Sequence, residues 1–150
     1  AKALVESGRL GQKSGGGFYD YQPGNHHPAT SSTAHHLIQE YAKQRGVESR
    51  ESSEQEIVER CVLALINEGA VIVSEGIVAR ASDIDVVYVQ GYGFPTYRGG
   101  PMFYADTLGL NKVRSGIRKW AKKYPHLWQE SPFISDLLKK KAKLSQSKAG

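Results

Sequence analysis

The stretch from residue 53 to residue 78 constrains this 150-residue chain more than any other. Ser53 with Glu56 three positions later is a capping box, in which the hydroxyl and the carboxylate satisfy backbone amides at a helix start. Apolar residues then recur at steps of three and four, the period of a helix with one buried face. They are Val58, Val62, Leu65, Ile66, Gly69, Ile72, Val73 and Gly76. The pattern predicts one long helix with several packing partners.

Shorter helices are predicted on both sides of this long one. The same periodicity favours helices over residues 82–90, from Pro101 onward, over 111–124 and over 133–143, with a short one over 35–45. Residues 86–89 are β-prone, but they stand between a helix cap and a glycine stop, so no strand is predicted. The sequence therefore predicts an all-α fold of the helical-bundle type.

The charge and composition of the chain limit the kinds of partner that we expect it to bind. The net charge is +5, and much of the excess lies in residues 112–123 and in the lysines after Leu138. No aromatic residues interleave the tail lysines as a base-stacking surface would require, so we expect a solvated tail, no nucleic acid and no membrane partner. No apolar run approaches the length of a membrane span, and the start does not read as a secretory signal. The single Cys61 is expected to be a buried thiol in a reducing compartment.

Several residues could carry chemistry, but none forms a recognisable site. The glycine-rich runs at 8–17 and 91–100 lack the strand and helix of a dinucleotide fingerprint and the Gly-Lys-Ser/Thr of a phosphate loop. The pairs His26-His27 and His35-His36 have no Cys or carboxylate at ligand spacing. We therefore expect no catalytic, cofactor-binding or metal-binding residue in this chain.

Four polar residues are interpreted as structural. Ser82 or Asp83 is expected to cap the helix over 82–90, and Asp85, two positions after Asp83, does not face it. Asn67 and Glu68 interrupt an apolar face and should bond the backbone of a neighbouring turn. Arg98 is expected to bridge loops; the alternative is an anionic ligand near a helix N-terminus.

The order of motifs after the long helix supports a family resemblance. Ile84-Asp85, the run from Gly91 to Pro95, Gly100-Pro101 and the run from Asp106 to Gly109 follow one another. In this arrangement residues 53–109 resemble the C-terminal helical domain of the 3-hydroxyacyl-CoA dehydrogenases. Residues 4–21 resemble the closing segment of the same kind of domain. The end of one copy thus precedes the start of another, as in multifunctional β-oxidation enzymes that also contain an enoyl-CoA hydratase.

One departure from the family pattern concerns catalysis. The catalytic copy carries an active-site Asn in a Val-Asn-Arg run, whereas this chain has Val58-Glu59-Arg60. The resemblance therefore implies the second, non-catalytic copy. It also implies a parent enzyme that oxidises 3-hydroxyacyl-CoA to 3-ketoacyl-CoA with NAD, its acyl-CoA substrate and NAD being bound by other parts. The isolated chain is expected to bind no NAD and to be inactive.

The resemblance divides the chain into four parts. Residues 1–21 are the closing segment of a preceding helical copy, 22–52 a linker with a short helix, 53–143 the helical C-terminal domain and 144–150 a frayed tail. The beginning at Ala1 suggests an excised fragment. The expected partners are the preceding helical and nucleotide-binding domains of the parent.

The apolar face around Val62, Leu65, Gly69 and Val73 is expected to be covered by the first copy, or by a second chain in a homodimer of the fragment. Leu65 lies in the middle of the apolar stripe of the longest helix, where an unpaired buried charge is costly, so Leu65→Asp should unfold or grossly destabilise the domain. The segment 4–21 should fold back on its own or its partner's helical core through Phe18, Tyr19 and Tyr21.

Two further expectations concern compartment and class. The terminal Ser-Lys-Ala-Gly differs from the Ser-Lys-Leu peroxisomal address and favours a bacterial cytoplasmic parent, with a peroxisomal one as the alternative. The alternative function is an independent helical module that places its basic tail on nucleic acid or membrane.

Overall fold

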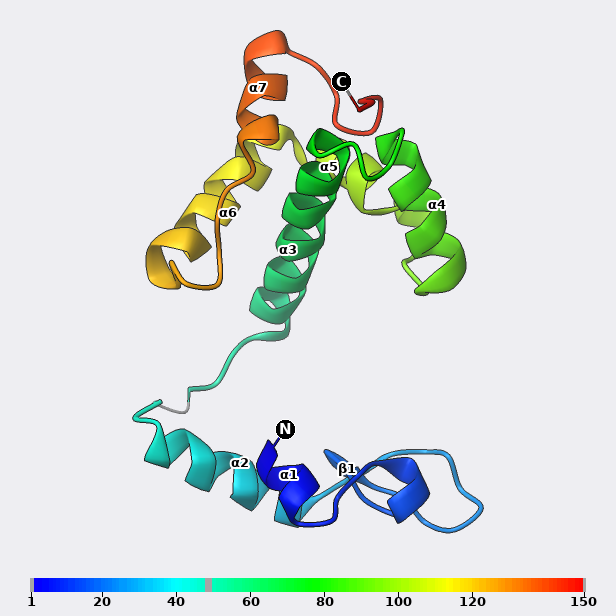
Figure 1. Cartoon of the computed structure of the whole chain (residues 1–150), viewed down its shortest axis with the longest axis vertical. Coiled ribbons are helices and arrows are strands. Elements are labelled where there is room, and N and C mark those ends of the chain that lie inside the picture. Colours follow the sequence, from blue (N-terminus) through cyan, green and yellow to red (C-terminus); the bar gives the residue numbers. More distant parts are fainter. Residues whose placement is uncertain (1, 48–49, 150) are drawn as a thin grey trace. The chain divides into compact units, whose positions relative to one another are not determined.

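The structure is a computed structural model that describes residues 2–47 and 50–149. The predictions made for Ala1, for residues 48–49 and for Gly150 lie outside the described residues. The chain divides into two compact units, residues 1–51 and residues 52–150. Helices make up most of the regular structure in both (Figure 1), which confirms the all-α class.

The first unit combines two helices with a small hairpin. Helix α1 (Lys2–Glu6) packs against helix α2 (Ser32–Gln44). Between them, strands β1 (Tyr19–Asp20) and β2 (Ala29–Thr30) pair in antiparallel fashion. The prediction that the chain has no strand is therefore wrong for this unit. Two-residue strands are too short to show the alternation of polar and apolar residues by which a strand is recognised.

A single arginine joins the parts of this first unit. The Arg9 side chain donates from Nε to the Gly17 carbonyl at 2.9 Å and from Nη2 to the Ser31 hydroxyl at 2.9 Å. It also pairs with the Asp20 carboxylate, whose pKa this hydrogen bond lowers. Ser31 in turn caps α2 by accepting the Ala34 amide. The glycine-rich turn, the hairpin and the start of α2 thus depend on one guanidinium group.

The second unit is a bundle built around one long helix. Helix α3 (Glu54–Ser74) lies in the middle of the unit in Figure 1 and contacts all four other helices. These are α4 (Ala81–Gly91), α5 (Pro101–Leu108), α6 (Leu110–Lys123) and α7 (Pro132–Lys140), with a 3-10 turn η2 (Thr96–Arg98) before α5. The predicted helices are confirmed, with ends that differ by a few residues.

The ends of α3 follow from its sequence. Ser53 caps the helix by accepting the Glu56 amide at 3.2 Å, as the capping box predicts. The helix ends at Ser74, before the predicted residue 78, because Gly76 takes a left-handed conformation with φ of 71°. Gly69 lies where α3 meets α5: a Cβ there would collide with the Met102 side chain, so this glycine permits the close approach of the two helices.

The buried face of α3 differs from the predicted one. Gly69 and Val73 are buried as expected, but Val62 and Leu65 are only half-buried. The central buried residue is Ile66, which is fully enclosed. The unfolding expected of Leu65→Asp therefore applies to Ile66→Asp instead. The rest of this core includes Leu63, Ala70, Met102, Val113, Ile117, Ile134, Leu137 and Leu144.

The segment after α7 is held against the bundle, whereas the sequence suggested a frayed tail. The Leu144 side chain is fully buried, and the Asp106 carboxylate accepts the amides of Leu144 at 2.8 Å and Ser145 at 2.9 Å. The Ala149 amide donates to the Ala79 carbonyl. This segment therefore belongs to the packed domain.

Candidate interaction surface

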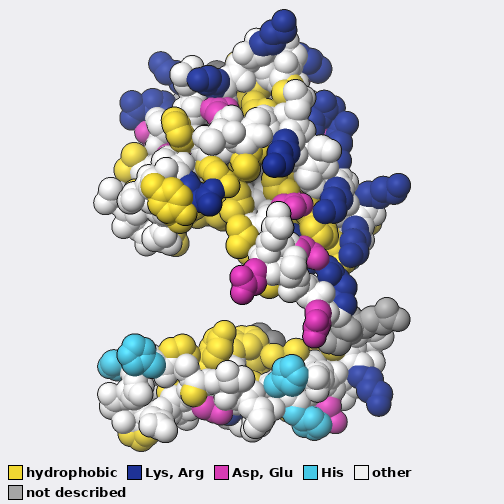
Figure 2. Space-filling view, turned by 180° about the vertical axis from the view of Figure 1, so that it is seen from behind, with side chains coloured by type: hydrophobic (Ala, Val, Ile, Leu, Met, Phe, Trp, Pro, Cys, Tyr) yellow, Lys and Arg dark blue, Asp and Glu magenta, His cyan; other side chains and the backbone are white. Residues whose placement is uncertain are grey.

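An apolar groove of about 530 Å³ runs along the second unit between α3, α4 and the loop that precedes α5. Figure 2 shows hydrophobic side chains gathered on this unit beside Lys and Arg groups. Helix α3 contributes Ile57, Val58, Cys61, Val62 and Leu65. Helix α4, the loop and α5 contribute Tyr88, Tyr92, Gly93, Phe94, Pro95, Tyr97, Arg98 and Tyr104.

The groove residues are unusually exposed for their type. Tyr97 is 81% exposed, Tyr92 75%, Val58 60% and Ile57 51%. Isolated apolar residues are common on protein surfaces, but a contiguous patch of them marks an interaction site. Tyr and Arg are also the residue types enriched at the centres of protein interfaces. The groove is therefore suited to a protein partner.

A second groove of about 410 Å³ lies next to the first, between α3 and α6. It shares Val58, Val62 and Tyr104 with the first groove and extends to α6. The two grooves thus flank a ridge formed by Val58 and Val62. A ridge between two grooves is the surface by which one helix packs against another.

Arg98 lies within the first groove and is held by tyrosine rings. Its guanidinium stands 4.5 Å from the centre of the Tyr104 ring and 5.2 Å from that of Tyr97, and it donates to the Tyr97 hydroxyl at 3.3 Å. It forms no ion pair with any described residue. The structural role expected for Arg98 fits these contacts, since the side chain joins the loop to α5 by cation–π interactions.

Asp85 holds the N-terminus of α5, one of the helices that line the first groove. Its carboxylate accepts the Met102 amide at 2.7 Å and the Phe103 amide at 3.1 Å at the N-terminus of α5. Burial raises the pKa of Asp85 to about 6, against the lowering effect of those two amides. Gly100 has φ of 97°, and a Cβ there would collide with Asp85. The Asp-x-Asp and Gly-Gly-Pro motifs therefore meet in space.

Two predictions about single residues in this region are wrong. Neither Ser82 nor Asp83 caps α4; Asp83 pairs with Arg80 at 2.8 Å on the surface, and it is Asp85 that accepts helix amides, those of α5. Cys61 is exposed and lines the groove, because the side of α3 it occupies is left uncovered.

The prediction for Asn67 is confirmed: its side chain donates to the Gln129 carbonyl and accepts the Ser131 amide. Glu68 is exposed.

Glu59, which stands where the catalytic copy of the resembled family has Asn, is engaged in structural contacts. Its carboxylate accepts from the Trp120 indole at 3.2 Å and lies 3.6 Å from the Lys119 ammonium. Arg60, the next residue, stacks over Trp120 and Tyr124 at about 5 Å. The end of α6 is thereby joined to the first half of α3.

The histidine pairs lie on the surface of the first unit. His26 contacts Gln12, His35 contacts Gln39 at 2.8 Å and His36 lies 3.7 Å from Glu40. Over residues 2–47 and 50–149, no group of three or more His, Cys, Asp or Glu side chains could hold a metal ion. In the same range, no helix is both long and apolar enough to cross a membrane.

The tyrosines of the groove were missed by sequence reasoning. Tyr88, Tyr92, Tyr97 and Tyr104 fall within 17 consecutive residues that also include Phe94. A loop rich in glycine normally carries polar side chains, so this density of aromatic residues was the available sign of an interaction surface.

Comparison with known proteins gives a consistent result. Residues 57–150 match the family described as 3-hydroxyacyl-CoA dehydrogenase, C-terminal domain. The peroxisomal bifunctional enzyme of Pongo abelii is 45% identical over 141 residues, which are 93% of this chain and 19% of that protein. That of Danio rerio is 41% identical over 140 residues, or 91% and 19%. The fatty acid oxidation complex subunit alpha of Acinetobacter baumannii is 38% identical over 123 residues, or 80% and 17%. The chain spans about one-fifth of the length of these relatives.

Proposed function

This chain belongs to the 3-hydroxyacyl-CoA dehydrogenase family through its C-terminal domain, and from that premise we propose that it forms part of a multifunctional fatty-acid β-oxidation enzyme. The match over residues 57–150 carries the proposal, and the names of the relatives support it. The parent would oxidise 3-hydroxyacyl-CoA to 3-ketoacyl-CoA with NAD. In that reaction a base takes the hydroxyl proton while a hydride passes to the nicotinamide.

We assign this chain a structural role in the parent, with NAD and acyl-CoA bound by other domains. The contacts of Glu59 support this role, because its carboxylate is occupied by Trp120 and Lys119. The exposed groove along α3 supports it as well: a surface of this composition stabilises an assembly when another helical domain covers it.

The partner proposed for the groove is the preceding helical domain of the same parent. A ridge of Val58 and Val62 between two apolar grooves fits the side chains of one further helix. In the absence of that domain, the same surface would pair with a second copy of this chain about a two-fold axis. Residues 1–21 are accordingly proposed as the closing segment of the preceding domain and residues 22–52 as the connection.

The compartment of the parent is also a proposal. The relatives include proteins named as peroxisomal from animals and plants, and a bacterial protein. The identity is higher to the animal peroxisomal proteins than to the bacterial protein, which favours a peroxisomal parent.

The catalytic part of the proposal is tested by comparing this chain with the longer protein from the same gene. Each is mixed with acetoacetyl-CoA and NADH, and the loss of NADH absorbance is followed. We expect turnover by the longer protein and none by the isolated chain above a heat-treated control. A longer protein without this activity would contradict the assignment of the parent, and turnover by the chain alone would contradict its structural role.

The association of the isolated chain is tested by sedimentation equilibrium over a range of concentrations. We expect a dimer that Val58→Asp weakens, because that change places a charge on the ridge between the grooves. Val86→Asp is the matched control, since Val86 is 61% exposed on α4 and lines neither groove. A monomer at all concentrations, or equal effects of the two variants, would contradict the proposed interface.

A further inference from the structure

The first groove, between α3, α4 and the loop before α5, contains a positive charge that nothing in this chain neutralises. Among the described residues that line it, Arg98 is the one that carries a charge. Its guanidinium is held by the rings of Tyr97 and Tyr104 and donates to the Tyr97 hydroxyl, but it forms no ion pair with any residue that the structure describes. The groove therefore combines apolar walls with one uncompensated cation.

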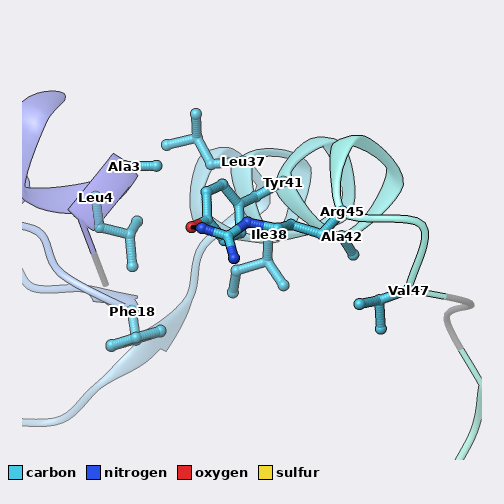
Figure 3. A pocket seen from close by; sticks show the side chains of 9 residues that line it. All are labelled: Ala3, Leu4, Phe18, Leu37, Ile38, Tyr41, Ala42, Arg45 and Val47. Carbon is cyan, nitrogen blue, oxygen red and sulfur yellow. Dashed lines mark hydrogen bonds between the residues drawn. The ribbon is translucent and has the colours of Figure 1, made fainter.

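An arginine of the first unit shows what is particular about Arg98. Arg45 lines an apolar groove of about 470 Å³ between α1 and α2 (Figure 3), where its Nη2 donates to the Tyr41 hydroxyl at 2.8 Å. Arg45 is exposed, so its charge can stay in water when an apolar partner covers that groove. Arg98 is half-buried against two rings, and a cover over the first groove would take its guanidinium out of water.

Removing Arg98 from water has an electrostatic consequence. A buried charge is costly unless it is paired and hydrogen-bonded. The cation–π contacts with Tyr97 and Tyr104 offset only part of that cost, because the rings carry no net charge. The planar guanidinium presents parallel donors that a carboxylate can accept with both oxygens. A stable cover for this groove must therefore bring a carboxylate to Arg98.

Tyrosine hydroxyls add hydrogen-bond donors to the same groove. Tyr88 and Tyr92 line it with their ring centres 5.3 Å apart, and their hydroxyls form no hydrogen bond with any described residue. A phenol donates readily to a carboxylate. On the opposite wall, Val58 and Leu65 offer only apolar contacts. The groove thus matches a segment in which one Asp or Glu lies among apolar residues.

We propose that Arg98 selects and orients the partner of the first groove by receiving an Asp or Glu side chain from an apolar helix of that partner. The partner is the helical domain that precedes this chain in the parent, and in this respect the inference rests on the proposed function. Apolar packing alone would let a helix slide along the groove, whereas a charge pair fixes its register and repels a helix with Lys or Arg at that point. The contacts with Tyr97 and Tyr104 hold the guanidinium in place beforehand.

Carbodiimide crosslinking of the longer protein tests this pair. The reagent joins an amine to a carboxylate that touches it, with loss of one water, so Arg98→Lys should convert the pair into an amide that mass spectrometry locates. Lysine keeps the charge and can keep the cation–π contact. Gln90→Lys is the matched control, because Gln90 is exposed on α4 and lines neither groove. The native pair of Lys139 and Asp136, at 3.0 Å, reports that the reagent has reacted.

We expect position 98 to be joined to an Asp or Glu in the part of the protein that precedes this chain, and position 90 to form no link to that part. Cys61 lines the same groove and reports whether it is covered. Its alkylation should be about tenfold slower in the longer protein than in the dilute isolated chain, because it then requires local opening. A protected Cys61 without the crosslink at position 98, or equal yields from positions 98 and 90, would overturn the inference.

Arg98→Met provides a second measurement that does not depend on the reach of a lysine. In the longer protein it would leave the partner's carboxylate buried and unpaired, so the alkylation of Cys61 should become faster; in the dilute isolated chain the rate should not change. An unchanged rate in the longer protein would overturn the charge pair while leaving the cover of the groove intact. A Cys61 that reacts equally fast in the isolated chain and in the unmodified longer protein would contradict that cover, and this inference with it. Dehydrogenase activity of the same samples reports separately on the assignment of the parent.

Discussion

The segments that follow α1 and α7 have nearly the same local structure, with a left-handed residue at Gly8 and at Lys141, but different parts of the chain hold them in place. After α7, the chain is fixed by the bundle: Leu144 fills its core and Asp106 binds two of the segment's amides. After α1, the chain is fixed by its own side chain, because Arg9 binds Gly17, Asp20 and Ser31 while Leu10 points into solvent. A short sequence pattern therefore sets how a helix ends, while the rest of the chain decides whether the next leucine is buried.

The largest effect should come from truncating the two leucines in the isolated chain. Leu144→Ala should lower the free energy of unfolding of the second unit by about 2–5 kcal/mol, because it removes buried methyl groups and leaves a cavity. Leu10→Ala should change stability by less than about 0.5 kcal/mol, as expected for an exposed site. Denaturant unfolding of both variants measures the difference, and similar losses would show that Leu10 is already packed in the isolated chain.

The carboxylate that seats the segment after α7 gives the next largest effect. Asp106→Ala should cost about 1–3 kcal/mol, because the amides of Leu144 and Ser145 would lose their acceptor where water is partly excluded. Asp136→Ala serves as the control, since that carboxylate pairs with Lys139 on the surface of α7. Thermal melts should separate the two variants. If they melt together, the segment is held by Leu144 alone.

A smaller and local effect is expected in the first unit. Arg9→Lys should weaken the glycine-rich turn and the hairpin by about 1–2 kcal/mol, since an ammonium group cannot reproduce the guanidinium's bonds to three separate acceptors. Hydrogen exchange should quicken at the amides of Gly17, Tyr21 and Ala34, whereas the amides of α3 should keep their protection. Faster exchange in both units would mean that the units do not unfold independently.

Most local features of this fold were predictable from the sequence, and most long-range ones were not. The start of α3 at Ser53 depends on near neighbours, because Ser53 and the amide that it caps are three residues apart. The end of α3 before Gly76 was missed, because the apolar period continues past it. Asn67 was recognised by its place on an apolar face, although its backbone partners lie 62 and 64 residues further along the chain. The exchange of roles between Asp83 and Asp85 was missed, because the amides that Asp85 accepts lie 17 and 18 residues further along the chain.

The face of α3 was misjudged for a related reason. Val62, Leu65 and Ile66 all fit the helical period, which cannot say which of them meets a helix of the same unit and which lies on an open groove. Cys61 was expected to be buried on the same ground. Apolar patterning predicts that a surface will be covered, and the identity of the cover depends on parts of the protein that the pattern does not describe.

The smallest effect is expected for the ion pairs next to α7 and in α1. Before α7, Glu130 is mostly buried and accepts from Arg114, Arg118 and Ser135. Burial opposes its ionisation, but these hydrogen bonds lower the pKa of Glu130 overall. At α1, Lys2 and Glu6 form a pair that is largely exposed. Glu130→Gln should therefore cost about 1 kcal/mol at neutral pH, and Glu6→Gln should have no measurable effect.

The pH dependence distinguishes this cause from a general loss of packing. A carboxyl group whose pKa is lower in the folded protein than its ordinary 4.5 stabilises the fold above that value, and this contribution disappears as the pH falls through the folded pKa. The difference in unfolding free energy between the unmodified chain and Glu130→Gln should thus be constant from neutral pH down to about 5 and shrink below it. Urea titrations at several pH values measure that difference. A difference that stays the same in acid would mean that Glu130 acts by its shape and hydrogen bonds, and that its charge contributes nothing to the anchoring of α7.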